Sequence, residues 1–250
     1  MQLNLMTWPE VDLRLKQGCC VMLPTGSTEQ HGPMGLVGTD AICANQIALS
    51  AAILCNGIVA PPLAYTPAPF NARFPGTVSI TTELFQETLS QICAGLLEQG
   101  FRGVFIVNGH GANLEPAYAV ASDLPAGAIH VQNWWDPVHV AELRAEMFGD
   151  WEGMHATPSE IAITQVFHGQ KPMGVAAEPP EKLSAAYIAA HSGDKHGPPD
   201  EHRARFPDGR VGSHSALATP EKGGILLRVA AEALASAFNA FSANKRATGT

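Results

Sequence analysis

The sequence predicts a three-layer α/β/α fold built on a mainly parallel central sheet. Short apolar runs alternate along the 250 residues with segments whose apolar residues recur at the helical period. The run 103–107 (GVFIV) is apolar at every position, as expected for a central strand covered on both faces. Hydrophobic residues make up 46% of the chain, enough to bury a sizeable core. We therefore expect a single domain over residues 1–250.

The first half of the chain begins with a strand, a helix and a second strand. The apolar run Cys19–Pro24 ends in a turn and predicts a short buried strand. In Asp40–Leu54 apolar residues recur on one helical face, and Asn56-Gly57 follows as a stop signal. The segment 57–61 (GIVAP) predicts the second strand. Five prolines and a glycine within 61–76 predict a loop.

The middle of the chain continues the alternation. A helix capped by Thr81 or Thr82 is expected to run through Glu98, because its apolar residues keep the 3.6-residue period. The strand 103–107 follows. A further helix is expected after Glu115-Pro116. The last strand of the sheet is expected at Ile129–Asn133.

Residues 170–215, rich in Pro, Gly, His and charged residues, interrupt the alternation. We interpret this segment, called the excursion below, as a lid or an interface arm of the same domain. The last helix is expected to begin after it, with Thr219 as N-cap and Pro220 at the first helical position.

Composition excludes several classes of protein. The net charge of −8, without any Lys/Arg run, argues against nucleic-acid binding. The N-terminus lacks a signal-peptide pattern, and no uninterrupted apolar stretch is long enough to predict a membrane span. Five cysteines without paired spacing favour a reducing cytoplasm. Charged residues are only 15% of the chain, which indicates surface buried between subunits.

Candidate metal ligands follow two of the predicted strands. Glu29 and His31 come just after the first strand, and His110 just after the strand 103–107. Asp40 lies where a helix is expected to begin. Because ligands collect at the carboxyl ends of parallel strands, we expect these four side chains to meet. Two imidazoles and two carboxylates suit Zn²⁺, Mn²⁺ or Fe²⁺.

Each of these residues also has a simpler explanation. A Glu-x-His pair on a glycine-rich loop is often solvated, Asp40 alone is a helix cap, and Asn108-Gly109 alone is a turn. His155 alone is a core histidine. All of these explanations would have to hold at once, at two strand ends of one sheet, which favours the metal site.

Four segments, in this order, resemble the motifs of one enzyme family. They are 26–33 (GSTEQHGP) with Gly38-Thr39-Asp40, then 108–113 (NGHGAN), His155-Ala156 with Glu160, and 218–223 (ATPEKG). The first matches the Glu-x-His-x8-Asp signature of the creatininase family, creatinine amidohydrolase and its relatives. The resemblance covers roughly residues 5–240 and implies a creatininase-like fold.

The resemblance also implies a site with two divalent metals, Zn, Mn or Fe. Glu29, Asp40 and His110 would hold one metal, and His31 with a bridging Asp40 the other. Creatinine-opening members carry a Glu where this chain has Ala112, which puts creatinine in doubt and leaves the second metal short of a ligand. We expect Glu160 to replace it. Thr157-Pro158 also departs from the Gly-Glu that is usual there.

The implied reaction is hydrolysis of a C–N bond in a small-molecule amide by a metal-activated water. His155 is the candidate for proton transfer, with Glu160 as a second catalytic candidate. Trp151, Trp135 and Asn108 are candidate substrate contacts, although core packing would equally explain the tryptophans. The family also implies a homo-hexamer.

The substrate stays open at this stage. A cyclic amide, a formamide and a short modified peptide are all compatible with the resemblance. A non-catalytic binding protein on the same fold is the alternative from another class. A Rossmann-type nucleotide site is disfavoured because no G-x-G-x-x-G follows a strand.

Overall fold

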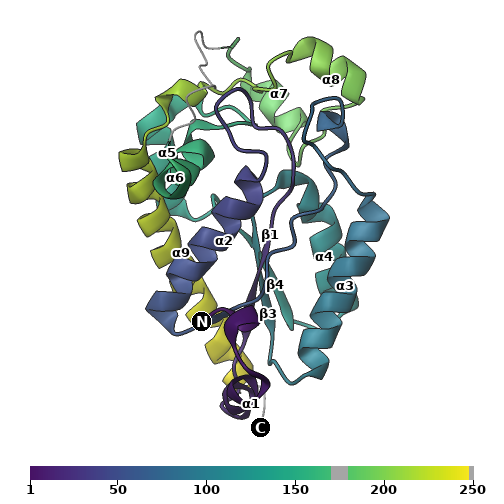
Figure 1. The fold of residues 1–250 in the computed structure, drawn as a ribbon, viewed down its shortest axis with the longest axis vertical. Coiled ribbons are helices and arrows are strands. Elements are labelled where there is room, and N and C mark those ends of the chain that lie inside the picture. The colour runs from purple at the N-terminus through teal and green to yellow at the C-terminus, as the bar shows by residue number, and fades with distance from the viewer. Residues whose placement is uncertain (170–179, 248–250) are drawn as a thin grey trace.

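A four-stranded sheet with all strands parallel forms the middle layer of the molecule (Figure 1). The computed structural model describes residues 1–169 and 180–247. The strand order is β2-β1-β3-β4. The strands are β1 Val21–Thr25, β2 Ile58–Val59, β3 Val104–Asn108 and β4 Ile129–Asn133. The expected fold class is confirmed.

Helices cover both faces of the sheet and both of its ends (Figure 1). Their bounds are α1 Trp8–Lys16, α2 Thr39–Cys55, α3 Thr82–Glu98, α4 Leu114–Asp123, α5 Val138–Phe148, α6 Pro158–His168, α7 Ala185–Ala190, α8 Pro199–Arg205 and α9 Pro220–Ala247. Short 3-10 turns occur at Leu3–Leu5, Pro69–Asn71, Gly111–Asn113, Gly149–Trp151 and Ser215–Leu217.

Alternate residues of the central strands face two separate cores. Met22 and Phe105 point to the side covered by α2, α5, α6 and α9. Val21 and Ile106 point to the side covered by α3 and α4. All residues of β1 and β3 are buried, which explains why these runs are apolar on both faces.

The observed elements agree with the expected ones to within a few residues. Thr81 is the N-cap of α3, with its side chain accepting the N–H of Leu84. Helix α4 begins at Leu114, before the expected start. Helices α1, α5, α6, α7 and α8 were not among the expected elements. The signal for α1 is present, since Thr7 and Glu10 form a capping box with Pro9 in the first turn.

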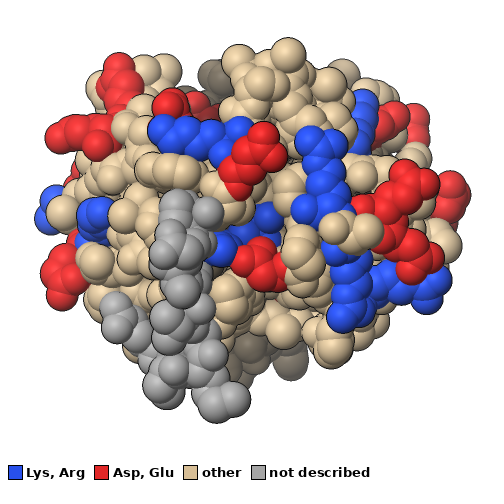
Figure 2. Space-filling view, turned by 90° about the horizontal axis from the view of Figure 1, so that it is seen from above, with Lys and Arg blue, Asp and Glu red and all other residues tan. Residues whose placement is uncertain are grey.

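The described part of the excursion lies across the carboxyl ends of the strands. This part, 180–215, contains α7 and α8, which sit at the top of the molecule (Figure 1). Arg73 in the loop after β2 makes two hydrogen bonds to Asp200 of α8. Residues 170–179 of this segment lie outside the described residues. Seen from above, this face carries Lys and Arg side chains next to Asp and Glu side chains (Figure 2).

Helix α9 is the one helix in the described chain that is long and apolar enough to cross a membrane by length and composition. Leu226, Leu234 and Phe238 on this helix are buried against the α2 side of the sheet. Helices in the core of a globular protein can have the same length and apolar composition, so these properties alone do not indicate a membrane span.

Candidate active site

The predicted ligands converge at the carboxyl ends of β1 and β3. Glu29 and His31 lie in the loop after β1, Asp40 in the first turn of α2, and His110 directly after β3. All four side chains are buried. Glu160, in the first turn of α6, joins them from the other half of the chain.

Two glycines allow these segments to come close enough. A Cβ atom on Gly26 would lie 2.2 Å from the backbone nitrogen of Ala41, and one on Gly109 would lie 2.4 Å from the carbonyl oxygen of Asp40. Neither contact is compatible with a side chain, so glycine is required at both positions. The ends of β1 and β3 can therefore rest directly on the N-terminus of α2.

A first group of candidate ligands consists of Glu29, Asp40 and His110. Nδ1 of His110 lies 3.2 Å from Oε1 of Glu29 and 3.0 Å from Oδ2 of Asp40. One ligand atom from each residue lies within 4.8 Å of the others, a spacing that one metal ion can span.

A second group consists of His31, Asp40 and Glu160. Nε2 of His31 lies 2.8 Å from Oδ1 of Asp40 and 3.8 Å from Oε1 of Glu160. Asp40 thus presents one carboxylate oxygen to each group, which is the geometry of a bridging ligand. A lone helix-capping role for Asp40 does not fit, because its carboxylate pairs with the side chains of His31, His110 and Ser27.

Three histidines of the site have one ring nitrogen tied to a backbone carbonyl oxygen. Such a nitrogen must carry the hydrogen, so in the neutral ring the other nitrogen keeps its lone pair. That other nitrogen faces the carboxylates in each case. The pairs are His31 Nδ1 with Glu29 O at 3.1 Å, His110 Nε2 with Pro67 O at 2.7 Å and His155 Nε2 with Gln30 O at 2.7 Å. Metal-ligating histidines are typically oriented in this way.

Glu29 carries an unsatisfied oxygen in the middle of the site. Its Oε2 accepts a hydrogen bond from the Asn71 side chain, whereas its buried Oε1 has no hydrogen-bond partner. Oε1 lies 3.7 Å from Nδ1 of His155, and Glu29, His31 and His155 form a third group with ligand spacing. A buried carboxylate oxygen that faces two imidazole nitrogens without a well-formed hydrogen bond is what a site built for a cation would present.

Buried carboxylates and histidines in the site shift one another's pKa values. Burial opposes a charged ring, but the neighbouring Asp40 carboxylate raises the pKa of His31 to about 10. Burial likewise opposes ionisation of Asp40, yet the charge of His31 holds the pKa of Asp40 well below its usual range. Burial raises the pKa of Glu160 to about 7. Protons on the histidines thus supply here the positive charge that metal ions would replace.

A cavity of about 430 Å³ opens onto these residues. Trp135 lines it, as do Arg144 and His155, and the neighbouring Trp134 packs edge-on against Trp135 with ring centroids 5.8 Å apart. The other lining residues are Asp40, Gly109, His110, Gly111, Leu114, Asn133, Trp134, Asp136, Gly153, Met154, Thr157, Glu160, Ile188, Ala189, Ser192, Gly193 and Asp194. Both predicted catalytic residues and one predicted substrate contact therefore border the same space.

Asn108 and Trp151 lie elsewhere than expected. Asn108 is completely buried, and its amide bonds to Thr25, Asn133 and the carbonyl of His110, so it holds the ends of β1, β3 and β4 together. Trp151 is not among the residues that line the cavity, and its ring packs against Lys182 of the excursion. As placed, neither side chain faces the cavity, because each is engaged by other parts of the protein.

Asp194 is a site residue that the sequence reasoning missed. It comes from the excursion, lines the cavity and lies 3.5 Å from Nδ1 of His110, measured from its Oδ2. The surrounding residues 191–197 (HSGDKHG) contain no helical or strand period that would place the aspartate. Its left-handed backbone, with φ of 58°, is one that Asp adopts more readily than most residues.

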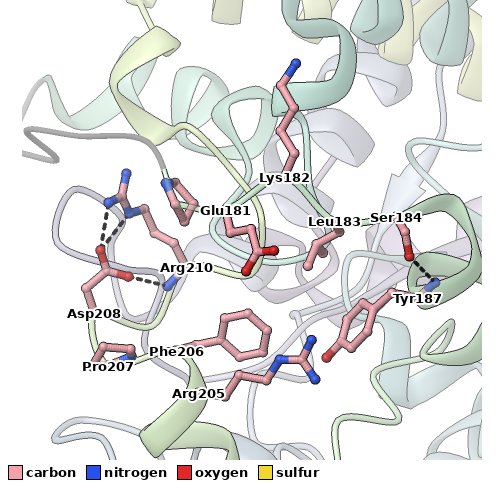
Figure 3. Close-up of a pocket in the computed structure, with 11 residues that line it drawn as sticks. Glu181, Lys182, Leu183, Ser184, Tyr187, Arg205, Phe206, Pro207, Asp208 and Arg210 are labelled. Atoms are coloured by element: carbon pink, nitrogen blue, oxygen red, sulfur yellow. Dashed lines mark hydrogen bonds and ion pairs between the residues drawn. The ribbon is translucent and has the colours of Figure 1, made fainter.

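A second cavity, of about 440 Å³, lies within the excursion (Figure 3). Arg210 pairs with Asp208 at its edge, and the guanidinium of Arg205 lies over the ring of Tyr187. The residues that line this cavity include no member of the three ligand groups. The cavity beside Asp40 and His155 is therefore the candidate active site.

Sequence comparisons connect this architecture to known enzymes. A family model described as creatinine amidohydrolase matches residues 4–238. The 3-dehydro-scyllo-inosose hydrolase of Thermotoga maritima is 30% identical over 239 residues, covering 87% of this chain and 76% of the relative. The creatinine amidohydrolase of Pseudomonas putida is 25% identical over 257 residues, covering 93% and 94%. A mycofactocin precursor peptide peptidase of Mycolicibacterium smegmatis is 38% identical over 108 residues, covering 41% and 43%.

Solved structures of creatininases share the fold. A manganese creatininase matches with a TM-score of 0.79 at 21% identity, over 94% of this chain and 96% of that chain. A zinc–zinc creatininase variant matches with a TM-score of 0.77 at 22% identity, over 94% and 96%. Since the family model spans nearly the whole chain, this protein is a hydrolase that belongs to the creatininase family.

Proposed function

We propose that this protein is a divalent-metal-dependent amidohydrolase that binds two metal ions per chain, Zn²⁺, Mn²⁺ or Fe²⁺. The observation that carries the proposal is the set of three histidines in which one ring nitrogen contacts a backbone carbonyl and the other faces a buried carboxylate. This donor set of imidazoles and carboxylates suits these metals. The structural relatives are named for manganese and zinc, which supports the choice of these metals.

In this proposal the two groups with shared Asp40 are the two metal sites. Glu29, Asp40 and His110 would hold one ion, and His31, Asp40 and Glu160 would hold the other. Metals bound there would supply an activated water and a polarised substrate carbonyl. The remaining task of the chain is to orient the substrate and to move a proton to the leaving nitrogen.

His155 is proposed to move that proton. Its Nε2 donates to the carbonyl of Gln30, so Nδ1 is the atom that accepts and releases a proton beside the cavity. Burial and the neighbouring His31 lower the pKa of His155, so the ring is neutral and can accept a proton near pH 7. The following residue, Ala156, has a positive φ of 55°, a strained conformation of the kind found at functional sites.

The cavity walls favour a small substrate with a flat apolar part and a polar part. Trp135 offers an apolar surface, while Arg144 and Asp136 add opposite charges along the wall. The named relatives act on creatinine, 3-dehydro-scyllo-inosose and a precursor peptide, so the substrate class must be tested broadly. We propose a cyclic amide, a formamide or a similar small amide.

The decisive experiment is a metal-dependent activity screen. Purified protein is stripped with a chelator, reloaded with Zn²⁺, Mn²⁺ or Fe²⁺, and assayed on creatinine, small formamides, 3-dehydro-scyllo-inosose and short peptides. We expect hydrolysis of at least one small amide by the reloaded protein and none by the stripped protein. Metal binding without turnover of any of these compounds would favour the alternative, a ligand-binding protein. Cleavage of peptides alone would favour a peptidase.

Creatinine itself is expected to be a poor substrate. Ala112 offers no carboxylate where creatinine-opening members of the family carry one. We expect kcat/KM for creatinine to be lower than for the best small amide by on the order of 100-fold, about 2.7 kcal/mol in activation free energy. Competition between the two substrates in one assay measures this ratio. Hydrolysis of creatinine at a rate equal to that of the best amide would contradict the expectation.

A homo-hexamer in the cytoplasm is proposed as the working form. Large apolar side chains are exposed near the N-terminal end of the chain and the end of α2, such as Trp8 at 80% and Ile53 at 84%. Burial of such a surface between subunits would explain the low share of charged residues. None of the five cysteines forms a disulfide in the described part of the chain, in keeping with a reducing compartment. Light scattering at micromolar concentration should give a multiple of 26.4 kDa, whereas a monomer would refute the assembly.

A further inference from the structure

The described part of the excursion forms one wall of the active-site cavity. Its lining residues are Ile188 and Ala189 of α7, with Ser192, Gly193 and Asp194 of the turn that follows. Helix α8 comes next along the chain, and both helices lie above the ends of the strands (Figure 1). The contacts that hold α7 and α8 in place therefore determine whether this wall of the cavity is closed.

His202 attaches α8 to the rest of the domain. Its side chain is among the most buried of the excursion, with 2% of the residue exposed. The imidazole packs edge-on against Phe70, with ring centroids 5.0 Å apart, and against Phe206 at 5.2 Å. Phe70 is itself buried and belongs to the 3-10 turn Pro69–Asn71, in the loop after β2. The ring of His202 thus lies between the excursion and the body of the domain.

Neither ring nitrogen of His202 has a hydrogen-bond partner in the described part of the chain. A neutral imidazole has one N–H donor and one acceptor nitrogen, and a protonated imidazole has two donors. Burial of the neutral ring without partners already costs free energy, and burial of the charged ring costs far more. The docked position of α8 is therefore compatible with a neutral His202 and opposes a protonated one.

The charged neighbours of His202 do not offset this cost. His196 packs against it with ring centroids 5.2 Å apart. Burial, and then the charges of His196 and His155, lower the pKa of His202 to about 3, although the carboxylate of Asp194 acts in the opposite direction. The titratable and charged groups on the elements around it are His155 before α6, His191, Asp194 and His196 after α7, Arg73 in the loop after β2, and Asp200, Glu201, Arg203 and Arg205 on α8.

A histidine with a lowered pKa makes the docked position sensitive to acid. In the detached excursion His202 would titrate near the ordinary value of about 6.5. Between that pH and its lowered pKa, the detached form binds a proton that the docked form does not bind. Docking is therefore at full strength above about pH 6.5 and weakens as the pH falls, by up to roughly tenfold in the docking equilibrium for each pH unit.

We propose that His202 is a pH-sensitive anchor, which holds α7 and α8 against Phe70 while its ring is neutral and detaches them when its ring is protonated. Detachment would remove the wall formed by Ile188 and its neighbours and open the active-site cavity. His202 belongs to none of the three ligand groups, so the proposal goes beyond the metal-dependent reaction. It concerns access to the cavity, whatever amide is hydrolysed there.

The test is amide hydrogen exchange of α8 in the full chain at pH 7.5 and pH 5.0. Mass spectrometry follows the exchange, and the rates are corrected for the pH dependence of the chemical step. From the two pKa values of His202, local opening of α8 should increase roughly 30-fold between these conditions. Amides of α3, which covers the other face of the sheet, serve as the internal reference for global unfolding.

His202→Phe removes the titrating group and keeps a ring between Phe70 and Phe206. In this variant the same acidification should change the opening of α8 by less than about threefold. His139→Phe is the same substitution at a histidine of α5 whose side chain is 84% exposed, and it should respond as the native protein does. All three proteins keep every candidate ligand, so loss of metal in acid affects them equally. His202→Leu repeats the test with a smaller side chain if phenylalanine prevents folding.

Two results would overturn the proposal. One is a native protein in which α8 opens equally at both pH values after correction. The other is a roughly 30-fold increase that persists in His202→Phe and His202→Leu, because another group would then cause it. Either result would leave the metal-dependent function untouched, since the amide screen tests that function separately.

Discussion

Asp40→Ala is expected to abolish binding of both metal ions and to lower kcat/KM by roughly 1,000-fold or more, about 4 kcal/mol in activation free energy. The reason is that the two oxygens of Asp40 face different groups, Oδ1 toward His31 and Oδ2 toward His110. Removal of the carboxylate takes a ligand from each site at once and increases the repulsion between two cations. Elemental analysis of the purified variant measures the metal content.

Asp40→Asn separates metal loss from misfolding. The amide keeps the shape of the side chain and an oxygen for the Ser27 hydroxyl, which donates to Asp40 over 2.9 Å. This variant should still fold, but unfold below the temperature of the metal-free native protein, because the buried charge pair with His31 is lost, and it should lack both ions. Asp12→Asn, an exposed carboxylate on α1, serves as the control with full metal content. Two ions per chain in Asp40→Ala would refute the bridging assignment.

Glu160→Gln is expected to release one ion selectively and to reduce turnover below detection. Glu160 faces His31 in the second group, while Glu29, Asp40 and His110 of the first group are untouched. Glutamine still completes the capping box with Thr157, so α6 should form normally. Metal analysis should therefore give about one ion per chain in a folded protein.

Thr157→Ala is the matched variant for the capping role. Its hydroxyl accepts the N–H of Glu160, and loss of this cap should cost about 1 kcal/mol in the free energy of unfolding. Both ions should remain bound, because the Glu160 carboxylate is intact. If instead Glu160→Gln keeps two ions and full turnover, its carboxylate acts as a helix cap only.

Much of the fold and of the site could be predicted from local pattern. The apolar run 103–107 predicted β3, and its side chains are buried on both faces as the run requires. Glu29, His31, Asp40 and His110 could be grouped because strand ends of a parallel sheet meet at one edge, and the structure brings them together. Helix α1 carried a Thr-x-x-Glu cap and an N-terminal proline, so a fuller use of those signals would have found it.

Other features depend on contacts between segments far apart in the chain. Trp151 has the apolar surface expected of a pocket wall, but the path of the excursion places Lys182 over its ring. Asn108 has an amide suited to a ligand, but Thr25 and Asn133 on the neighbouring strands use it. Residue type alone does not distinguish these roles, because the partners that decide them are distant in sequence.

The sequence by itself determined the alternating strands and helices, the ligand types after β1 and β3, and membership of the family. The strands and helices follow from interactions within a few residues, namely alternation along a strand, the period of a helix, caps and glycine turns. Family membership rests instead on the resemblance of four motifs in their order along the chain. Only the tertiary structure decided that Glu160 faces His31, that Asp40 stands between two groups, and that Asp194 reaches His110 from the excursion. The physical reason is that contacts between buried charged side chains depend on the path of the loops over the edge of the sheet. The hydrophobic periodicity of the sequence does not determine that path.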